Sequence, residues 1–132
     1  MTSIAKALYA FYSGFGLPAY PEDGVPSDEE DGVPSVAKLP YITYTIVQPD
    51  YIDSAVHQAR IWYKSDSYEG VNAKADEIIS AVGRGLLLPA GDGAVCLRPG
   101  TPLAQHMPIE GKPEIKIVYL NFQLNAYHTQ GV

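Results

Sequence analysis

Residues 118–127 read VYLNFQLNAY, an alternation of apolar and polar side chains that predicts a long β-strand. The apolar set consists of Val118, Leu120, Phe122, Leu124 and Ala126. The opposite set is polar without being charged and consists of Tyr119, Asn121, Gln123, Asn125 and Tyr127. We therefore expect one face of this strand to enter the core. The other suits contact with a neighbouring protein or ordered water rather than open solvent.

Two further strands are predicted upstream. Tyr41–Gln48 is rich in β-branched and aromatic residues and lies between two prolines. Ala55–Lys64 is the second, and the linker between the two is short enough for an antiparallel pair. In this second strand one predicted face holds Ala59, Ile61 and Tyr63, and the other holds Arg60, Trp62 and Lys64.

Helical periodicity marks two segments. Thr2–Ser13 carries apolar residues at i, i+4, i+7 and i+8 and is followed by glycines and a proline. A second helix is predicted after Asp66, which with Glu69 has the spacing of a capping box. An apolar stripe follows, and Gly83 is expected to end this helix.

The remaining segments complete the predicted fold class. Leu86–Leu88 and Gly93–Arg98 are expected to be short strands, and Pro99–Pro113, with four prolines, a loop. We predict one α+β domain over residues 1–132, a two-layer sandwich. Its sheet is mostly antiparallel or mixed, and its two helices pack on one face.

Composition excludes several classes of protein. The chain has 132 residues, of which 46% are hydrophobic, and a net charge of −6. An acidic chain is unsuited to nucleic-acid binding driven by electrostatics. One cysteine excludes an internal disulfide, and no apolar run approaches the roughly 20 residues of a membrane span. These features predict a soluble cytosolic protein without membrane contact.

The negative charge is concentrated in a predicted Pro-rich loop at residues 15–40. Its acidic cluster consists of Glu22, Asp23, Asp28, Glu29, Glu30 and Asp31. The rest of the chain has nine acids against nine bases and is neutral. The pentapeptide Asp-Gly-Val-Pro-Ser occurs twice in this loop, at 23–27 and 31–35. Loops of this length in small domains are functional or solvated and disordered, and both interpretations stay open.

No arrangement of residues predicts catalysis, and we expect a protein that is not an enzyme and has no metal and no cofactor. The histidines, His57, His106 and His128, lack metal-ligand spacing and are expected at the surface or in the sheet. Cys96 lies in an apolar run and is expected in the core. Trp62 between Arg60 and Lys64 fits a base-stacking patch, a subunit contact or an ordinary solvent-facing surface, and the neutral remainder of the chain favours the last two.

Three stretches resemble a known family. They are Pro40-Tyr41-Ile42-Thr43-Tyr44, Ala59-Arg60-Ile61-Trp62-Tyr63-Lys64 and Ser67-Tyr68-Glu69-Gly70-Val71-Asn72-Ala73-Lys74-Ala75-Asp76-Glu77-Ile78. In sequence and order they look like the tail terminator and minor tail proteins of long-tailed bacteriophages. The resemblance covers the architecture of nearly the whole chain through diffuse patterns, and the duplicated loop lies outside the family's pattern.

The resemblance implies a structural protein of the virion tail, assembled in the host cytoplasm. Members of the family cap the tail tube as a ring, usually of six subunits. They contact the tail tube protein and the head–tail connector while DNA passes through without specific binding. We expect the subunit interface to use Arg60, Trp62, Lys64, Tyr119, Asn121, Gln123 and Asn125. The acidic cluster is expected to face the lumen and repel phosphate.

Two alternatives remain open from the sequence. The same order of elements suits another neck or tail-completion component. It also suits a small ligand-binding α+β domain or metabolic enzyme, which requires a pocket with convergent polar groups.

Overall fold

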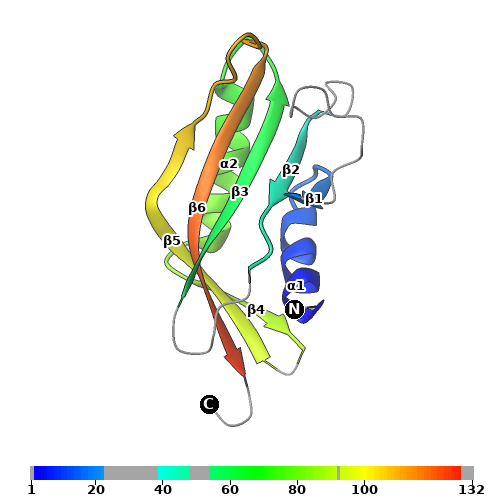
Figure 1. The fold of residues 1–132 in the computed structure, drawn as a ribbon, viewed down its shortest axis with the longest axis vertical. Helices are drawn as coiled ribbons and strands as arrows, with labels where there is room; N and C mark the ends of the chain where they lie inside the picture. Colours follow the sequence, from blue (N-terminus) through cyan, green and yellow to red (C-terminus); the bar gives the residue numbers. More distant parts are fainter. Residues whose placement is uncertain (1, 23–38, 48–53, 92, 129–132) are drawn as a thin grey trace.

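The computed structural model describes residues 2–22, 39–47, 54–91 and 93–128. Two helices and six strands follow one another along this part of the chain (Figure 1). In chain order they are α1 (Thr2–Ser13), β1 (Ala19–Pro21), β2 (Tyr41–Tyr44), β3 (Ala55–Lys64), α2 (Glu69–Val82), β4 (Leu86–Ala90), β5 (Gly93–His106) and β6 (Ile115–His128).

The strands form one six-stranded sheet in the order β1-β2-β3-β6-β5-β4. All neighbouring pairs are antiparallel except β1 and β2, so the sheet is mixed. The pair β3–β6 is central and unbroken, from Ala55 opposite Leu124 to Lys64 opposite Ile115. Since side chains alternate across a strand, this register assigns every residue of both strands to one of two faces.

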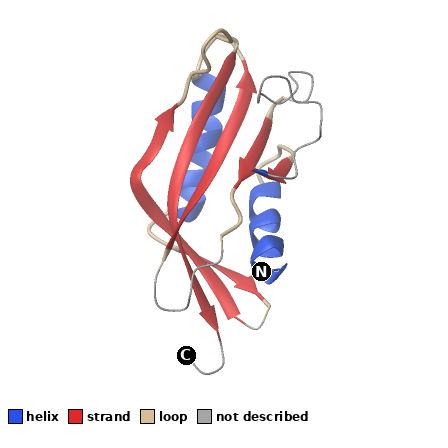
Figure 2. Cartoon of the chain, in the orientation of Figure 1, coloured by secondary structure: helices blue, strands red, loops and turns tan. Residues whose placement is uncertain are grey.

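Both helices contribute to one hydrophobic core. α2 contacts β3, β5 and β6 and lies behind β3 and β6 in Figure 2. α1 contacts β1 and β4, which are the two end strands of the sheet order, so the sheet curls around this helix. The core contains Leu8 and Tyr12 from α1 together with Ile78 from α2. The predicted α+β class and mixed sheet are confirmed.

A second, smaller cluster lies on the sheet face opposite the helices. Trp62 packs there with Tyr41, Ile115 and Ile117, and all four side chains are buried. These residues are neighbours in the register, because Trp62 is opposite both Tyr41 on β2 and Ile117 on β6. One end of the sheet therefore has hydrophobic packing on both faces.

Several predicted boundaries are confirmed. α1 and β3 have the predicted limits, and β6 shows the predicted alternation of buried and accessible residues. α2 ends at Gly83, whose φ of 57° is in the left-handed region that glycine tolerates. The capping box is wrong: Tyr68 is at the N-cap of α2 and makes no side-chain capping bond.

Two strand predictions near the first loop need correction. β1 lies inside the segment predicted as loop, where it pairs with β2 through three residues only. β2 ends at Tyr44 rather than Gln48, because the next residue uses its side chain. The Thr45 hydroxyl accepts the Gln58 backbone N–H at 3.0 Å and so takes the place of a backbone carbonyl in the ladder. The greater part of the predicted loop, residues 23–38, lies outside the described residues.

The largest error concerns β5. The sequence predicted a strand to Arg98 and then a loop, whereas β5 continues to His106 through Pro99 and Pro102. Within the described chain β4 pairs only with residues 93–97, so the prolines lie where β5 has β6 on one side alone. Proline is tolerated at such an edge, and the register shifts between Pro99 and Ala104. β4 is also longer than predicted and ends at Ala90.

None of the helices in the described residues is both long and apolar enough to cross a membrane.

Close backbone packing between β5 and β6 gives a first testable prediction. A methyl group at Gly100 would lie 2.9 Å from the Asn121 carbonyl oxygen, which is backbone and cannot rotate away. Gly100→Ala is therefore expected to lower the free energy of unfolding by about 1–3 kcal/mol, measured by urea denaturation. Gly85→Ala is the matched control, because its nearest atom lies at 3.7 Å, an ordinary contact. Equal stability of both variants would contradict the prediction.

Candidate functional site

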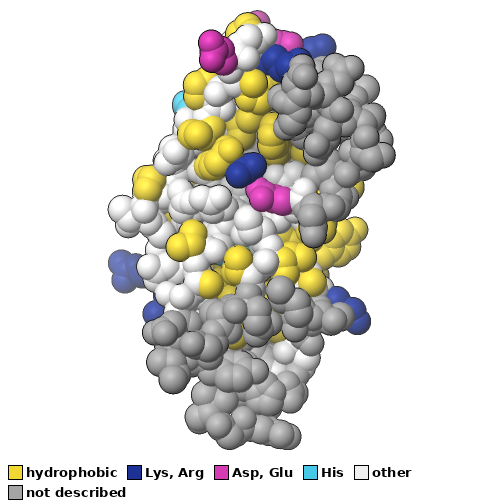
Figure 3. All heavy atoms as spheres, viewed as in Figure 1, with side chains coloured by type: hydrophobic (Ala, Val, Ile, Leu, Met, Phe, Trp, Pro, Cys, Tyr) yellow, Lys and Arg dark blue, Asp and Glu magenta, His cyan; other side chains and the backbone are white. Residues whose placement is uncertain are grey.

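The seven predicted interface residues lie on one face of the sheet, opposite the helices. Arg60 is opposite Tyr119, and the even-numbered residues of β3 share this face with the odd-numbered residues of β6. The face is turned toward the viewer in Figure 3, where a basic and an acidic side chain meet among uncharged atoms. We call the part formed by Gln58, Arg60, Tyr119, Asn121, Gln123 and Asn125 the polar face.

Arg60 is the charged centre of the polar face. Its guanidinium lies over the Tyr119 ring, 4.4 Å from the ring centroid. Its Nε is 3.1 Å from Glu22 Oε1, and both side chains are about 30% exposed (29% and 32%). The two atoms are close without the alignment of a hydrogen bond, so the contact is an ion pair. Partial exposure limits the stabilisation from this pair to about 0.2–1 kcal/mol.

Amide side chains occupy the rest of the polar face. Gln58 donates from Nε2 to Asn121 Oδ1 at 2.9 Å, and Asn121 donates from Nδ2 to the Pro102 carbonyl at 2.9 Å. Gln123 is exposed and Asn125 half-buried. Two of these amides are thus held in place by protein partners, while the others remain accessible. A rigid, uncharged and accessible surface can be desolvated on contact at little electrostatic cost.

Trp62 is placed on this face but is not accessible from solvent. It is only 7% exposed, and its Nε1 donates to Thr43 Oγ1 at 3.0 Å. A nucleobase cannot stack on a ring that is already packed in a cluster, so the structure disfavours the base-stacking interpretation. Lys64, at the end of β3, is exposed.

Only one member of the predicted acidic cluster falls within the described chain. Glu22 directly follows β1 and is the carboxylate that pairs with Arg60. The other five, Asp23, Asp28, Glu29, Glu30 and Asp31, lie outside the described residues.

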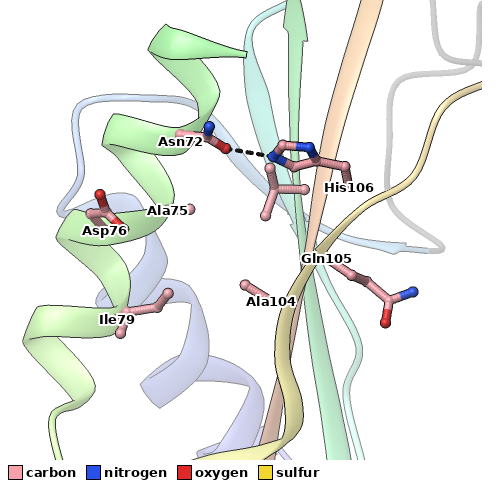
Figure 4. Close-up of a pocket in the computed structure, with 8 residues that line it drawn as sticks. Asn72, Ala75, Asp76, Ile79, Ala104, Gln105 and His106 are labelled. Atoms are coloured by element: carbon pink, nitrogen blue, oxygen red, sulfur yellow. Dashed lines mark hydrogen bonds between the residues drawn. The ribbon is translucent and has the colours of Figure 1, made fainter.

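A cleft of about 430 Å³ lies between α2 and β5 (Figure 4). His106 bonds Asn72 through Nε2 and Oδ1 at 2.8 Å, and its ring stacks on Tyr68 with centroids 3.8 Å apart. Ala75, Ile79 and Ala104 provide apolar walls, while Gln105 points away from the cleft. Asn72 and His106 therefore satisfy each other, and Asp76 is the one carboxylate among the described residues that lines the cleft. His106 is exposed, as predicted.

His57 is the functional group that sequence reasoning placed least well. It lies in β3 as expected but is fully buried between α1 and the sheet. Tyr12 OH is 2.8 Å from its Nε2, and Thr45 Oγ1 is 3.3 Å from its Nδ1. A neutral ring fits both contacts, donating from one nitrogen and accepting at the other. The alternation of side chains along β3 could have predicted this burial, since His57 is two residues before Ala59 and therefore lies on the same, core-facing side of the strand.

Burial changes the pKa values in this cluster. Desolvation lowers the pKa of His57 to about 4, although a hydrogen bond with the Thr45 backbone opposes the shift. Desolvation raises the pKa of Tyr12, with a smaller contribution from neighbouring Tyr44. Both groups are therefore neutral at physiological pH and act as hydrogen-bonding partners within the core.

The described residues contain no group of three or more metal-ligating side chains. Cys96 is buried in β5 with its thiol free, as predicted.

The fold has a counterpart in a virion. A chain in the virion of a native gene transfer agent particle superposes with a TM-score of 0.62. The match covers 96% of this chain and 99% of that chain, at 17% sequence identity. At this identity the similarity shows a shared fold. No protein-family model matches the sequence, and a search of curated proteins finds no match.

The buried histidine gives a prediction for pH dependence. Because the pKa of His57 is lower in the folded state than its unfolded value of 6.5, the unfolded state binds more protons between these values. Its contribution to stability is complete above pH 6.5 and is lost as pH falls toward 4. Between pH 7.5 and pH 5 the expected loss from this residue is roughly 2 kcal/mol.

Urea denaturation at both pH values measures this loss. His57→Gln removes the titrating group, so the difference between the two pH values is expected to shrink by that amount. An identical pH dependence in both proteins would show that His57 does not titrate in this way.

Proposed function

We propose that this protein is a structural component of a virion, a tail terminator that caps the tail tube as a ring and joins it to the head connector. The observation that carries the proposal is the fold shared with a gene transfer agent virion chain over nearly the full length of both chains. The order of helices and strands is also the one that the resemblance to tail terminator and minor tail proteins implies.

The polar face supports a subunit contact. A ring needs a heterologous interface, in which one patch of a subunit meets a different patch of the next. Aromatic and arginine side chains are enriched in such interfaces, and Arg60 and Tyr119 provide one of each. Lys64 and the accessible amides Gln123 and Asn125 extend the patch along β3 and β6, and the buried Trp62 lies on the same sheet face.

In this proposal the whole chain is one two-layer domain and one ring subunit, six of which form the cap in the virion tail after assembly in the host cytoplasm. Its partners are further copies of itself, the tail tube protein and the head–tail connector protein. DNA passes through without specific binding, and no catalysis or cofactor is involved. Glu22 is engaged with Arg60, so Asp23, Asp28, Glu29, Glu30 and Asp31 are the members of the acidic cluster left to line the lumen.

Another neck or tail-completion component is the neighbouring possibility, since the shared fold fits it equally. Binding to the tail tube protein separates the two, because a terminator contacts the tube directly. The cleft between α2 and β5 gives little support to the ligand-binding alternative, because Asn72 and His106 bond each other there.

The first experiment measures the mass of the purified protein by light scattering over a concentration series, with negative-stain images of the same sample. The purified tail tube protein is then added. A closed ring, or a ring formed only on the tube, is the expected result. A monomer that neither closes nor binds the tube would contradict the proposal.

Charge placed on the polar face tests the interface. Gln123→Lys with Asn125→Lys places two charges, which must be desolvated, in every subunit contact, so ring formation is expected to weaken at least tenfold by light scattering. The control is Ala73→Lys with Ser80→Lys, which adds the same charge to exposed positions of α2. If the control disrupts the ring and the test variant does not, the interface lies on the helical side instead.

A further inference from the structure

A second cleft, of about 740 Å³, lies at the β4 end of the sheet. Its lining comes from the turn before β4 and from β4, β5 and β6: Arg84, Gly85, Leu87, Ala94, Cys96, Arg98 and Tyr127. Register places it on the same sheet face as the polar face, because Arg98 is opposite Gln123. We call it the arginine cleft.

The arginine cleft combines apolar surface with two positively charged side chains. Leu87 is 64% exposed and Tyr127 is 43% exposed, so two large hydrophobic side chains of the cleft contact solvent. No carboxylate among the described residues pairs with Arg84 or Arg98. The stem of Arg98 lies against Gly85, where a Cβ atom would be 3.7 Å from its Cγ. The surface therefore suits an acidic segment that also carries apolar side chains.

The chain itself contains such a segment. Residues 23–38 include five carboxylates and a single base, Lys38. The repeated Asp-Gly-Val-Pro places an acid two residues before a valine, at 23–26 and again at 31–34. These two copies match a surface that offers two arginines beside exposed apolar groups.

The ends of this segment lie on the same sheet face as the arginine cleft. Glu22 pairs with Arg60, and Leu39 packs on the cluster around Trp62. The 16 intervening residues can extend about 26 Å out and return. The Glu22–Arg60 pair also shows that the first acid of the cluster binds an arginine of this face.

We propose that the arginine cleft binds the acidic segment 23–38 of a second copy of this chain. The inference rests on the proposed ring, which it deepens by naming a contact between subunits. A segment of one copy on a cleft of the next is heterologous, so repetition of the contact closes a ring when the rotation divides a full turn. Acids bound in this way do not line the lumen, and the two roles exclude one another.

A synthetic peptide of residues 22–35, carrying a fluorophore, tests the cleft directly by anisotropy. We expect binding that weakens at least tenfold in Arg84→Glu with Arg98→Glu, and that weakens as salt rises. Lys6→Glu with Lys112→Glu changes the net charge equally, away from the cleft, and is expected to bind as the parent does. Equal binding of a scrambled peptide of the same composition would overturn the segment as the specific occupant. Binding of a duplex DNA oligomer to the cleft, without binding of the peptide, would overturn it as well.

Exchange of charges between two proteins tests whether the contact joins separate copies. One variant carries Arg84→Glu with Arg98→Glu, and the other carries Asp23→Lys with Asp31→Lys. Neither variant is expected to form rings by itself, whereas an equimolar mixture of the two is expected to form them. If the parent protein assembles only on the tail tube, the same comparison is made with the tube present. A third variant carries all four changes in one chain. If association recovers in that variant but not in the mixture, the segment binds the cleft of its own copy, and the proposal is overturned.

These outcomes are separable from the fate of the proposed function. If the parent protein forms rings on the tube and both variants still do so, the cleft contact is wrong while the terminator role stands. If the parent neither forms rings nor binds the tube, the terminator role fails, and the peptide experiment still reports on the cleft.

Discussion

The antiparallel pairing of β3 with β6 is the constraint on which the rest of the structure depends. Its register runs from Ala55 opposite Leu124 to Lys64 opposite Ile115 without interruption. A shift of one residue in either strand would move that strand's apolar set to the solvent side and its amides into the core. The helices, the polar face and both hydrophobic clusters therefore all follow from this one alignment.

The N-terminal helix imposes the second constraint, because it contacts strands at both ends of the sheet order. Hydrophobic burial of Leu8 and Tyr12 favours the packing of α1 between the two ends of the sheet. The contact of Tyr12 with His57 adds a hydrogen bond, which fixes the orientation of the helix. A buried neutral imidazole needs partners for both nitrogens, and Tyr12 and Thr45 supply them. Curling the sheet around α1 brings these partners together. The hydrogen bonds of His57 therefore favour this one packing of α1 on the sheet, whereas hydrophobic burial alone favours any arrangement that covers its apolar side chains.

Much of this architecture could be predicted from local periodicity, and the errors have physical causes. α1, β3 and the alternation of β6 depend on patterns within one segment, and these were found. The path of β5 through Pro99 and Pro102 depends on a neighbour that the local sequence does not contain. β1 is too short to carry a pattern of its own and is recognisable only by its pairing with β2. The capping-box spacing of Asp66 and Glu69 was present, but α2 begins two residues later than that pattern requires.

The candidate site shows the same division between local pattern and placement in space. Alternation predicted that Arg60 and Lys64 share one face of β3 and that the amides share one face of β6, and the register shows that both are the same face of the sheet. It did not predict that Trp62 is covered, because burial there depends on Tyr41 and Ile117. Counting charges gave an incomplete description. Outside the acidic cluster the acids and bases balance in number, but they are distributed unevenly over the surface. The bases Arg60, Lys64, Arg84 and Arg98 lie on or beside one sheet face. On the other side α2 carries three acids, Glu69, Asp76 and Glu77, against one base, Lys74, which pairs with Glu77. In the proposed ring, the basic face attracts the acidic segment of a neighbouring copy and α2 repels it, so the position of the charges, rather than the net charge, selects the surface for assembly.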